Sequence, residues 1–217
     1  MAIRHVTAEE FPAYELGKWV ESNRERLFWG FFTFGETRYL LVSRGESPHA
    51  GYGVRFTDLR RKADGTLVAT ATWSDPEPGR LYAQVISYPF DLIATPASTP
   101  AYELRFVGPG APESPGRVEP DVILEAPAPG DRLASPLRLR GKARVFEGRL
   151  QVELEDGHNV LLRKVLAGPG APAWMEFDER LAFDRPTNPS GMLTVYALSP
   201  RDGSKQNVVM VPVGFAE

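Results

Sequence analysis

Residues 127–150, PAPGDRLASPLRLRGKARVFEGRL, decide the fold class of this chain. Over residues 137–145, small or apolar side chains alternate with four basic ones, which are Arg138, Arg140, Lys142 and Arg144. A period of two is typical of a β-strand that packs one face on a core and turns the other to solvent. Phe146-Glu147-Gly148 follows the alternation as a turn. The stretch therefore predicts a half-buried strand, and with it a β-rich module.

The run after this turn, residues 150–154, repeats the period of two with acidic residues on its outer face. Two arrangements of these successive strands remain open. In a simple hairpin, the cations of 138–144 would lie opposite Glu153 and Glu155 and pair with them. In a sandwich, residues 146–148 would carry the chain from one sheet to the other, and the two charged faces would point apart. We expect the crossing.

The second half continues with short strands at regular spacing. Asp156-Gly157 and Asp202-Gly203 are tight-turn signals between strands, and the turns alone account for these aspartates. The expected strands lie near 121–126, 137–145, 149–156, 159–167, 173–183, 192–199 and 205–213. Short, evenly spaced strands of this kind predict a β-sandwich of about seven strands over residues 121–217.

The first half, residues 1–108, is expected to form a separate α+β or mostly-β domain. Apolar residues at helical spacing predict an amphipathic helix at about 12–26. Strands are then expected at 28–34, 39–43, 54–59, 67–73, 81–88, 91–94 and 102–107. Residues 109–120 are rich in Pro and Gly without apolar periodicity, which is typical of a linker. The chain is thus predicted to be mostly β, with two domains.

Composition limits the classes of protein that the chain fits. Its 217 residues are 42% hydrophobic and 11% aromatic, which is enough for packed cores. The formal net charge is −3 and neither half is strongly basic, which argues against a nucleic-acid-binding protein. No stretch approaches the ~20 consecutive apolar residues that span a bilayer. The absence of cysteine excludes disulfides, thiolate ligands and cysteine nucleophiles.

The sequence carries no recognisable catalytic constellation. It has neither a Gly-x-Ser-x-Gly elbow nor a phosphate-cradling glycine loop before a helix. His5, His49 and His158 lack the close spacing of zinc ligands. Acidic residues cluster at 153–156 and 176–179, where a strand pattern makes them solvated faces rather than a glycosidase pair. We therefore expect no enzymatic activity, no metal and no cofactor.

Two surfaces are candidates for binding, and the first is a row of cations. Its members Arg138, Arg140, Lys142 and Arg144 recur every ~6.6 Å along one strand face. The row is either a solvated outer face that discourages aggregation or a site for an anionic partner such as a wall polymer.

The second candidate surface is aromatic. In the run 28–34, FWGFFTF, Trp29 and Phe31 occupy one face of a strand while other aromatic residues occupy the opposite face. Either the 12–26 helix covers the Trp29 face, which we favour, or these side chains stay exposed for a partner or for the other domain. Tyr52 is a further candidate, because it lies in a loop, 44–53, that would enter a protein cleft if the chain were a protease-associated factor.

Short motifs in a fixed order connect both halves to known families. In the second half they are Ala126-Pro127-Ala128-Pro129-Gly130, Ser135-Pro136-Leu137, Gly141-Lys142-Ala143, Val145-Phe146-Glu147-Gly148, Trp174…Phe177, Leu193-Thr194-Val195-Tyr196 and Asp202-Gly203. With them this half resembles the immunoglobulin-like domain of bacterial spore germination proteins. The first half is similar to the C-terminal domain of PrcB-type protease-complex subunits in Tyr39-Leu40-Leu41-Val42, Gly51-Tyr52-Gly53-Val54, Pro78-Gly79 and Tyr88-Pro89-Phe90. The resemblances imply an immunoglobulin-like sandwich and bacterial, extracytoplasmic, non-catalytic modules that bind or stabilise envelope proteins.

The expected function is therefore protein–protein binding by a non-enzymatic module of the envelope or of sporulation and germination. One alternative is a protease-associated stabiliser or inhibitor, and another is a carbohydrate- or cell-wall-binding accessory protein that uses Trp73 and Trp174 as aromatic platforms. The partner is expected to be another envelope or spore protein, with a protease or an anionic wall polymer as alternatives. The first residues lack the apolar core of a signal peptide, so the location is extracytoplasmic if an export signal was removed and cytoplasmic otherwise.

Overall fold

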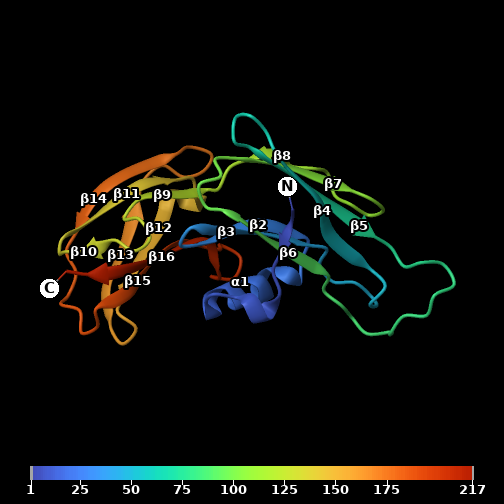
Figure 1. Cartoon of the computed structure of the whole chain (residues 1–217), viewed down its shortest axis with the longest axis horizontal. Coiled ribbons are helices and arrows are strands. Elements are labelled where there is room, and N and C mark those ends of the chain that lie inside the picture. Colours follow the sequence, from blue (N-terminus) through green and yellow to red (C-terminus); the bar gives the residue numbers. More distant parts are fainter. Residues whose placement is uncertain (1, 217) are drawn as a thin grey trace. The chain divides into compact units, whose positions relative to one another are not determined.

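The computed structural model describes residues 2–216 and consists mostly of β-strands (Figure 1). The chain divides into two compact units, residues 1–31 with 37–119 and residues 32–36 with 120–217. Each unit has a hydrophobic core of its own. One α-helix occurs among the described residues, α1 (Tyr14–Arg24), and a short 3-10 turn, η1 (Ala8–Glu10), precedes it. The mostly-β fold with a single helix in the first half is confirmed.

The first unit contains a sheet that is covered on both faces. Its strands, in the order β1-β6-β3-β2, are β1 (Arg4–His5), β6 (Phe90–Pro96), β3 (Thr37–Ser43) and β2 (Phe28–Phe34), of which residues 28–31 belong to this unit. All residues of β3 from Arg38 to Ser43 are buried, because α1 packs on one face of the sheet and a second sheet packs on the other. A strand buried on both faces shows no alternation, which explains the continuous apolar run 39–42.

Helix α1 packs on the Phe28 side of β2. The Trp19 ring meets the Phe28 ring edge-on, with centroids 5.8 Å apart. Gly30 leaves room for the Phe28 ring, since a Cβ atom there would lie 2.6 Å from it. The expectation that the helix covers the Trp29 face is therefore wrong. Aromatic residues occupy both faces of β2, so their pattern alone does not indicate which face the helix covers.

The second sheet of this unit packs against the first to form the core. Its strands, in the order β4-β5-β7-β8, are β4 (Gly53–Arg61), β5 (Leu67–Ser74), β7 (Tyr102–Val107) and β8 (Gly116–Val118). The core between the sheets includes Phe31 and Leu40 from one side and Phe56, Trp73 and Tyr102 from the other. Strand β8 lies within the Pro- and Gly-rich stretch 109–120 and pairs with β7.

The second unit is an immunoglobulin-like sandwich of two sheets. One sheet, in the order β14-β11-β9, consists of β14 (Met175–Leu181), β11 (Leu137–Ala143) and β9 (Val122–Ala126). The other, in the order β16-β15-β12-β13, consists of β16 (Lys205–Phe215), β15 (Ser190–Leu198), β12 (Arg149–Glu155) and β13 (Val160–Ala167), with β10 (Arg132–Leu133) beside β16. Residues 32–36 also belong to this unit, where Thr33 and Phe34 pair in parallel with Val209 and Met210 of β16.

The chain crosses between these sheets at the expected corner. Strands β11 and β12 follow each other in sequence but lie in different sheets, so the crossing is confirmed and the simple hairpin is excluded. A short 3-10 turn, η2 (Phe146–Gly148), makes the corner. Gly148 has a φ of 62° there, and a Cβ atom on it would lie 2.0 Å from the Gly168 carbonyl oxygen. Only glycine satisfies both conditions.

Asp156 ties two loops of the second unit together. Its side chain accepts hydrogen bonds from the backbone N–H groups of His158 (3.0 Å), Asn159 (2.7 Å) and Thr187 (2.7 Å), and from the Thr187 hydroxyl (2.8 Å). These donors hold the pKa of Asp156 far below its usual value. The residue is only 2% exposed. The tight turn accounts for part of its role, and the bonds to Thr187 add a link between distant loops.

Candidate binding surfaces

Three members of the cation row, Arg138, Arg140 and Lys142, lie on the outer face of β11, the central strand of its sheet, and Arg144 directly follows the strand. The Arg138 guanidinium donates two hydrogen bonds to Asp178 on β14, of 2.7 and 2.6 Å. This pairing lowers the pKa of Asp178. Arg140 forms an ion pair of 2.8 Å with Glu125 on β9. The neighbouring strands therefore neutralise the two cations at the start of the row.

The other end of the row is also engaged. Arg144 donates hydrogen bonds of 3.1 and 2.9 Å to Asp121. Burial raises the pKa of Asp121, an effect that Arg144 opposes. The Lys142 ammonium lies 4.6 Å from the centre of the Trp174 ring, and the Arg144 guanidinium lies 4.8 Å from it. Trp174 is thus half-buried beneath two cations, so its ring is a cation partner within the protein.

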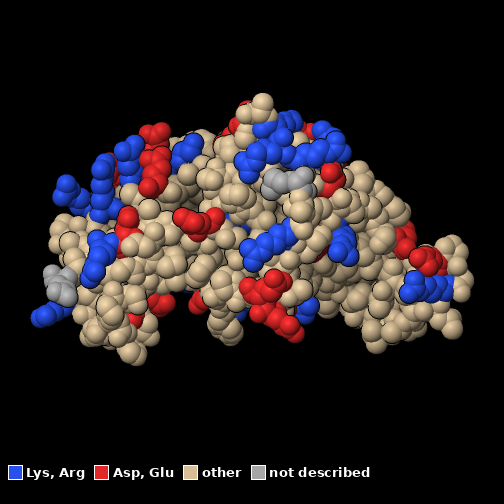
Figure 2. All heavy atoms as spheres, viewed as in Figure 1, with Lys and Arg blue, Asp and Glu red and all other residues tan. Residues whose placement is uncertain are grey.

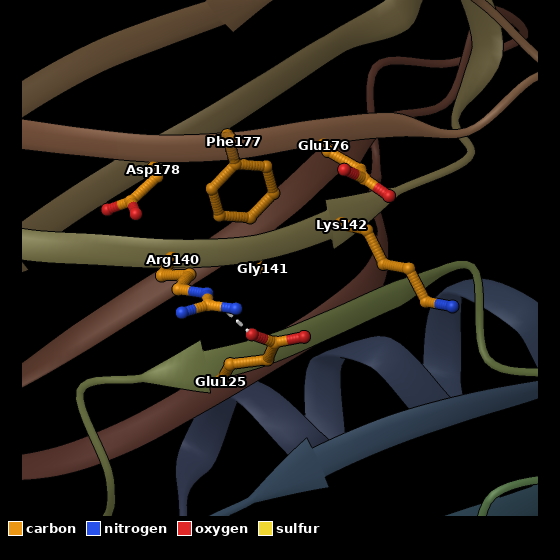
Figure 3. Close-up of a pocket in the computed structure, with 7 residues that line it drawn as sticks. All are labelled: Glu125, Arg140, Gly141, Lys142, Glu176, Phe177 and Asp178. Carbon is orange, nitrogen blue, oxygen red and sulfur yellow. Dashed lines mark ion pairs between the residues drawn. The ribbon is translucent and has the colours of Figure 1, made fainter.

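A groove of about 460 Å³ opens on this face, between the side chains of β9, β11 and β14 (Figure 3). Its lining residues are Glu125, Arg140, Gly141, Lys142, Glu176, Phe177 and Asp178. Gly141 permits the close approach of β9, because a Cβ atom there would lie 2.3 Å from the Ile123 carbonyl oxygen. The lining carries both signs of charge, and basic and acidic side chains are interspersed over this region of the surface (Figure 2). The face is charge-compensated rather than cationic.

The structure places the aromatic candidates Trp29 and Phe31 side by side in the first unit. Their rings meet edge-on, with centroids 6.2 Å apart. Phe31 is only 7% exposed and packs at 4.7 Å against Tyr102, while Trp29 is partly buried against the same core. Phe31 is therefore a core residue that is not available to a partner, which corrects its place among the binding candidates.

Tyr52 lies elsewhere, in a column of five stacked side chains. The Arg44 guanidinium lies 4.6 Å from the Tyr52 ring, Tyr52 packs at 4.9 Å against His49, and His49 stacks at 5.7 Å on Tyr82. The Arg80 guanidinium closes the column, 5.4 Å from the Tyr82 ring. The column joins the segment 44–53 to the segment 75–89, which connects β5 to β6.

Backbone hydrogen bonds also fasten segment 75–89 to segment 44–53. Ser47 and Ser87 exchange two, of 2.8 and 2.9 Å, and the Ala50 N–H donates to the Ala83 carbonyl at 3.3 Å. The Ser87 hydroxyl donates to the His49 carbonyl at 2.9 Å. We call segment 75–89 the pinned loop. Long ordered loops without strands or helices of their own are frequently functional.

The pinned loop turns apolar side chains to solvent. Leu81 is 97% exposed, Val85 59% and Ile86 60%. The strand expected at 81–88 is not formed, since only Ser87 makes an isolated bridge there. Sequence reasoning missed these residues because Leu81, Ala83 and Val85 follow the same period of two as a half-buried strand. The preceding Pro- and Gly-rich residues 75–79 were the one signal of a long loop.

Two further features bear on the class of protein. In residues 2–216, no group of three or more His, Asp or Glu side chains is arranged to hold a metal ion. No helix of that range combines the length and the apolar character that crossing a bilayer requires.

Comparisons with known proteins match both units. Residues 121–204 match the family described as the immunoglobulin-like domain of bacterial spore germination. Residues 38–96 match the family described as PrcB C-terminal. Both resemblances, and their positions, are thus confirmed. The comparisons with curated proteins and with solved structures found no match. The pinned loop and the segment that fastens it both lie within the PrcB C-terminal match.

Proposed function

We propose that this chain is a non-catalytic, extracytoplasmic protein of a bacterium, and that it binds an endoprotease partner through the pinned loop. The observation that carries the proposal is a loop whose backbone is fixed at several points while Leu81, Val85 and Ile86 face solvent. The position of the loop within the PrcB C-terminal match supports a role in a protease complex. The match of the second unit to a spore germination domain supports a bacterial envelope setting.

The exposed aliphatic side chains contribute part of the energy of a specific complex. Complete burial of a fully exposed aliphatic side chain contributes roughly 1.5–3 kcal/mol, and since Val85 and Ile86 are 59% and 60% exposed, the three offer a gross gain of about 3–6 kcal/mol. Association costs a comparable amount or more in lost translational, rotational and side-chain freedom, so other contacts must contribute as well. A loop that is already fastened loses less freedom than a mobile one, so more of the gain remains as affinity.

The alternatives have less support from the side chains. The cation row offers little free positive charge to a wall polymer, since three of its four members are ion-paired to carboxylates. Of the two tryptophans considered as carbohydrate platforms, Trp73 is 1% exposed and Trp174 lies beneath two cations.

The test is direct binding to purified serine endoproteases whose catalytic serine is replaced by alanine, so that their clefts stay open but cleave nothing. We expect at least one of subtilisin, chymotrypsin and elastase to bind in sedimentation velocity. The double variant Val85→Ser/Ile86→Ser should bind at least tenfold more weakly. Val160→Ser is the matched control, because Val160 is 44% exposed in the other unit. Absence of binding to every protease, or equal binding by the double variant, would overturn the proposal.

A further inference from the structure

Within the pinned loop, Leu81 differs from its neighbours. It is almost completely exposed, whereas Arg80 before it is paired with Glu77 and Tyr82 after it stacks on His49. A single exposed apolar side chain between two residues that have partners in the protein is suited to an apolar pocket of another protein. Leu81 is therefore a candidate for insertion into a pocket of a partner, and not only for contact with a flat apolar surface.

Tyr82 holds the chain after Leu81. Its ring stacks on His49 with an interplanar angle of 22°. Its hydroxyl oxygen accepts a hydrogen bond of 3.0 Å from the Glu77 N–H, and its carbonyl accepts one of 3.1 Å from the Gln84 amide. Both the side chain and the backbone of Tyr82 are thus tied to the loop and to its support.

Arg80 holds the chain before Leu81. Its N–H donates to the Glu77 carbonyl at 3.2 Å and closes a turn in which Gly79 has a φ of 79°. Its guanidinium lies 3.3 Å from the Glu77 carboxylate and stacks over the Tyr82 ring. The Arg80 guanidinium thus has partners within the loop although its side chain is 63% exposed. Leu81, at 97% exposed, is the apolar side chain left to enter a partner.

We propose that Leu81 enters the specificity pocket of a serine endoprotease that selects large apolar side chains, and that the pinned loop thereby inhibits this protease competitively. The inference rests on the proposed function and specifies it further. An apolar specificity pocket of this kind takes one large side chain and lies next to the catalytic serine. A loop held in place before binding loses little conformational freedom in the complex, as in other protease–inhibitor pairs.

The same fastening accounts for inhibition instead of digestion. When the protease serine oxygen attacks the Leu81 carbonyl carbon, the Leu81–Tyr82 C–N bond breaks and an ester to the serine forms. The serine proton passes through the protease histidine to the amine of Tyr82. Because Tyr82 is stacked on His49 and bonded to Glu77, this amine stays beside the ester. It attacks the ester again, the histidine takes its proton back to the serine, and the peptide bond reforms.

The experiment measures inhibition of active chymotrypsin and trypsin by the full chain. Chymotrypsin has an apolar specificity pocket, whereas that of trypsin contains an aspartate and selects basic side chains. We expect the wild type to inhibit chymotrypsin at least tenfold more tightly than trypsin. Leu81→Lys should reverse this preference, losing at least tenfold against chymotrypsin and gaining at least tenfold against trypsin. Val107→Lys is the matched control, because Val107 is an exposed apolar residue of the same unit outside the loop.

Each outcome decides one of the two proposals. Rapid cleavage after Leu81 without inhibition would overturn the inference, as would a Leu81→Lys variant with unchanged preference. Direct binding is also measured with chymotrypsin whose specificity pocket is filled by a covalent phenylalanyl chloromethyl ketone. Equal binding to the filled enzyme and to the open serine-to-alanine enzyme would place the contact outside the pocket, which overturns the inference and leaves the proposed function standing. Absence of binding to the open enzymes overturns both. Circular dichroism and thermal unfolding confirm that each variant folds.

Discussion

The outer face of β11 and the pinned loop are both exposed, but they differ in whether their exposed side chains already have partners within the protein. On β11, carboxylates of the flanking residues take up three of four cations and Trp174 takes up the fourth. In the loop, several backbone groups are hydrogen-bonded while three aliphatic side chains are 59–97% exposed. Exposed ion pairs of this kind contribute little to stability or to binding. The difference shows that a prominent sequence pattern can mark a surface whose charges are already paired, while exposed apolar side chains lie where no such pattern was noticed.

If polar groups with partners inside the protein serve stability, then removing such a group should destabilise the second unit. The largest effect is expected at Asp156. Asp156→Asn replaces a charged acceptor of four hydrogen bonds with an amide, so we expect the melting temperature at pH 7 to fall by roughly 5–10 °C. Glu155→Gln is the control, because Glu155 is exposed in the same segment, and it should change the melting temperature by less than about 1 °C.

The same carboxylate predicts a pH dependence with a defined sign. Since the folded protein lowers the pKa of Asp156, its stabilising effect is complete above the usual pKa of the group, 3.8, and declines as pH falls below that value. Melting temperatures between pH 7 and 2 should therefore drop more steeply below pH 4 in the wild type than in Asp156→Asn. Parallel profiles for the two proteins would contradict this account.

In the pinned loop, the comparison predicts a local effect without a global one. Tyr82→Ala removes the stack on His49 and the bond from Glu77, so the loop should open and be cut by proteinase K at least tenfold faster. The melting temperature should change by less than roughly 2 °C, because Tyr82 lies outside the core. Tyr14→Ala, at an exposed tyrosine of the same unit, should leave the cleavage rate unchanged. A loop equally resistant in both variants would show that the stack does not hold it.

The smallest effect is expected on the face of β11. The wild type should elute from an anionic matrix at or below about 0.1 M salt, because its cations are already paired and the rest is screened. Glu125→Gln/Asp178→Asn frees Arg140 and Arg138 and should elute later. Glu147→Gln/Glu179→Gln, which removes the same charge from unpaired positions, is the control. Strong retention of the wild type that Arg140→Gln abolishes would restore the row as an anion site.

Sequence alone predicted what depends on local periodicity. The alternation at 137–145 and the turn at 146–148 located a strand and a corner, and the crossing between sheets was the favoured one of two arrangements that the pattern left open. It did not predict that 175–181 would bring Asp178 to Arg138, because cross-strand register is set by tertiary packing. The sequence also predicted a strand over 81–88. That segment has the period of two but no neighbouring strand with which to form a ladder of hydrogen bonds. The candidate site was missed for that reason.

Residues 32–36 have a consequence for how this protein is made. They belong to the second unit and pair with β16, which ends at Phe215. During translation, these residues leave the ribosome long before their neighbouring strand does, because β16 lies far downstream in the sequence. Their backbone groups must therefore stay bonded to water until β16 has been synthesised. An early stop codon that removes β16 would thus also deprive residues 32–36 of their pairing strand.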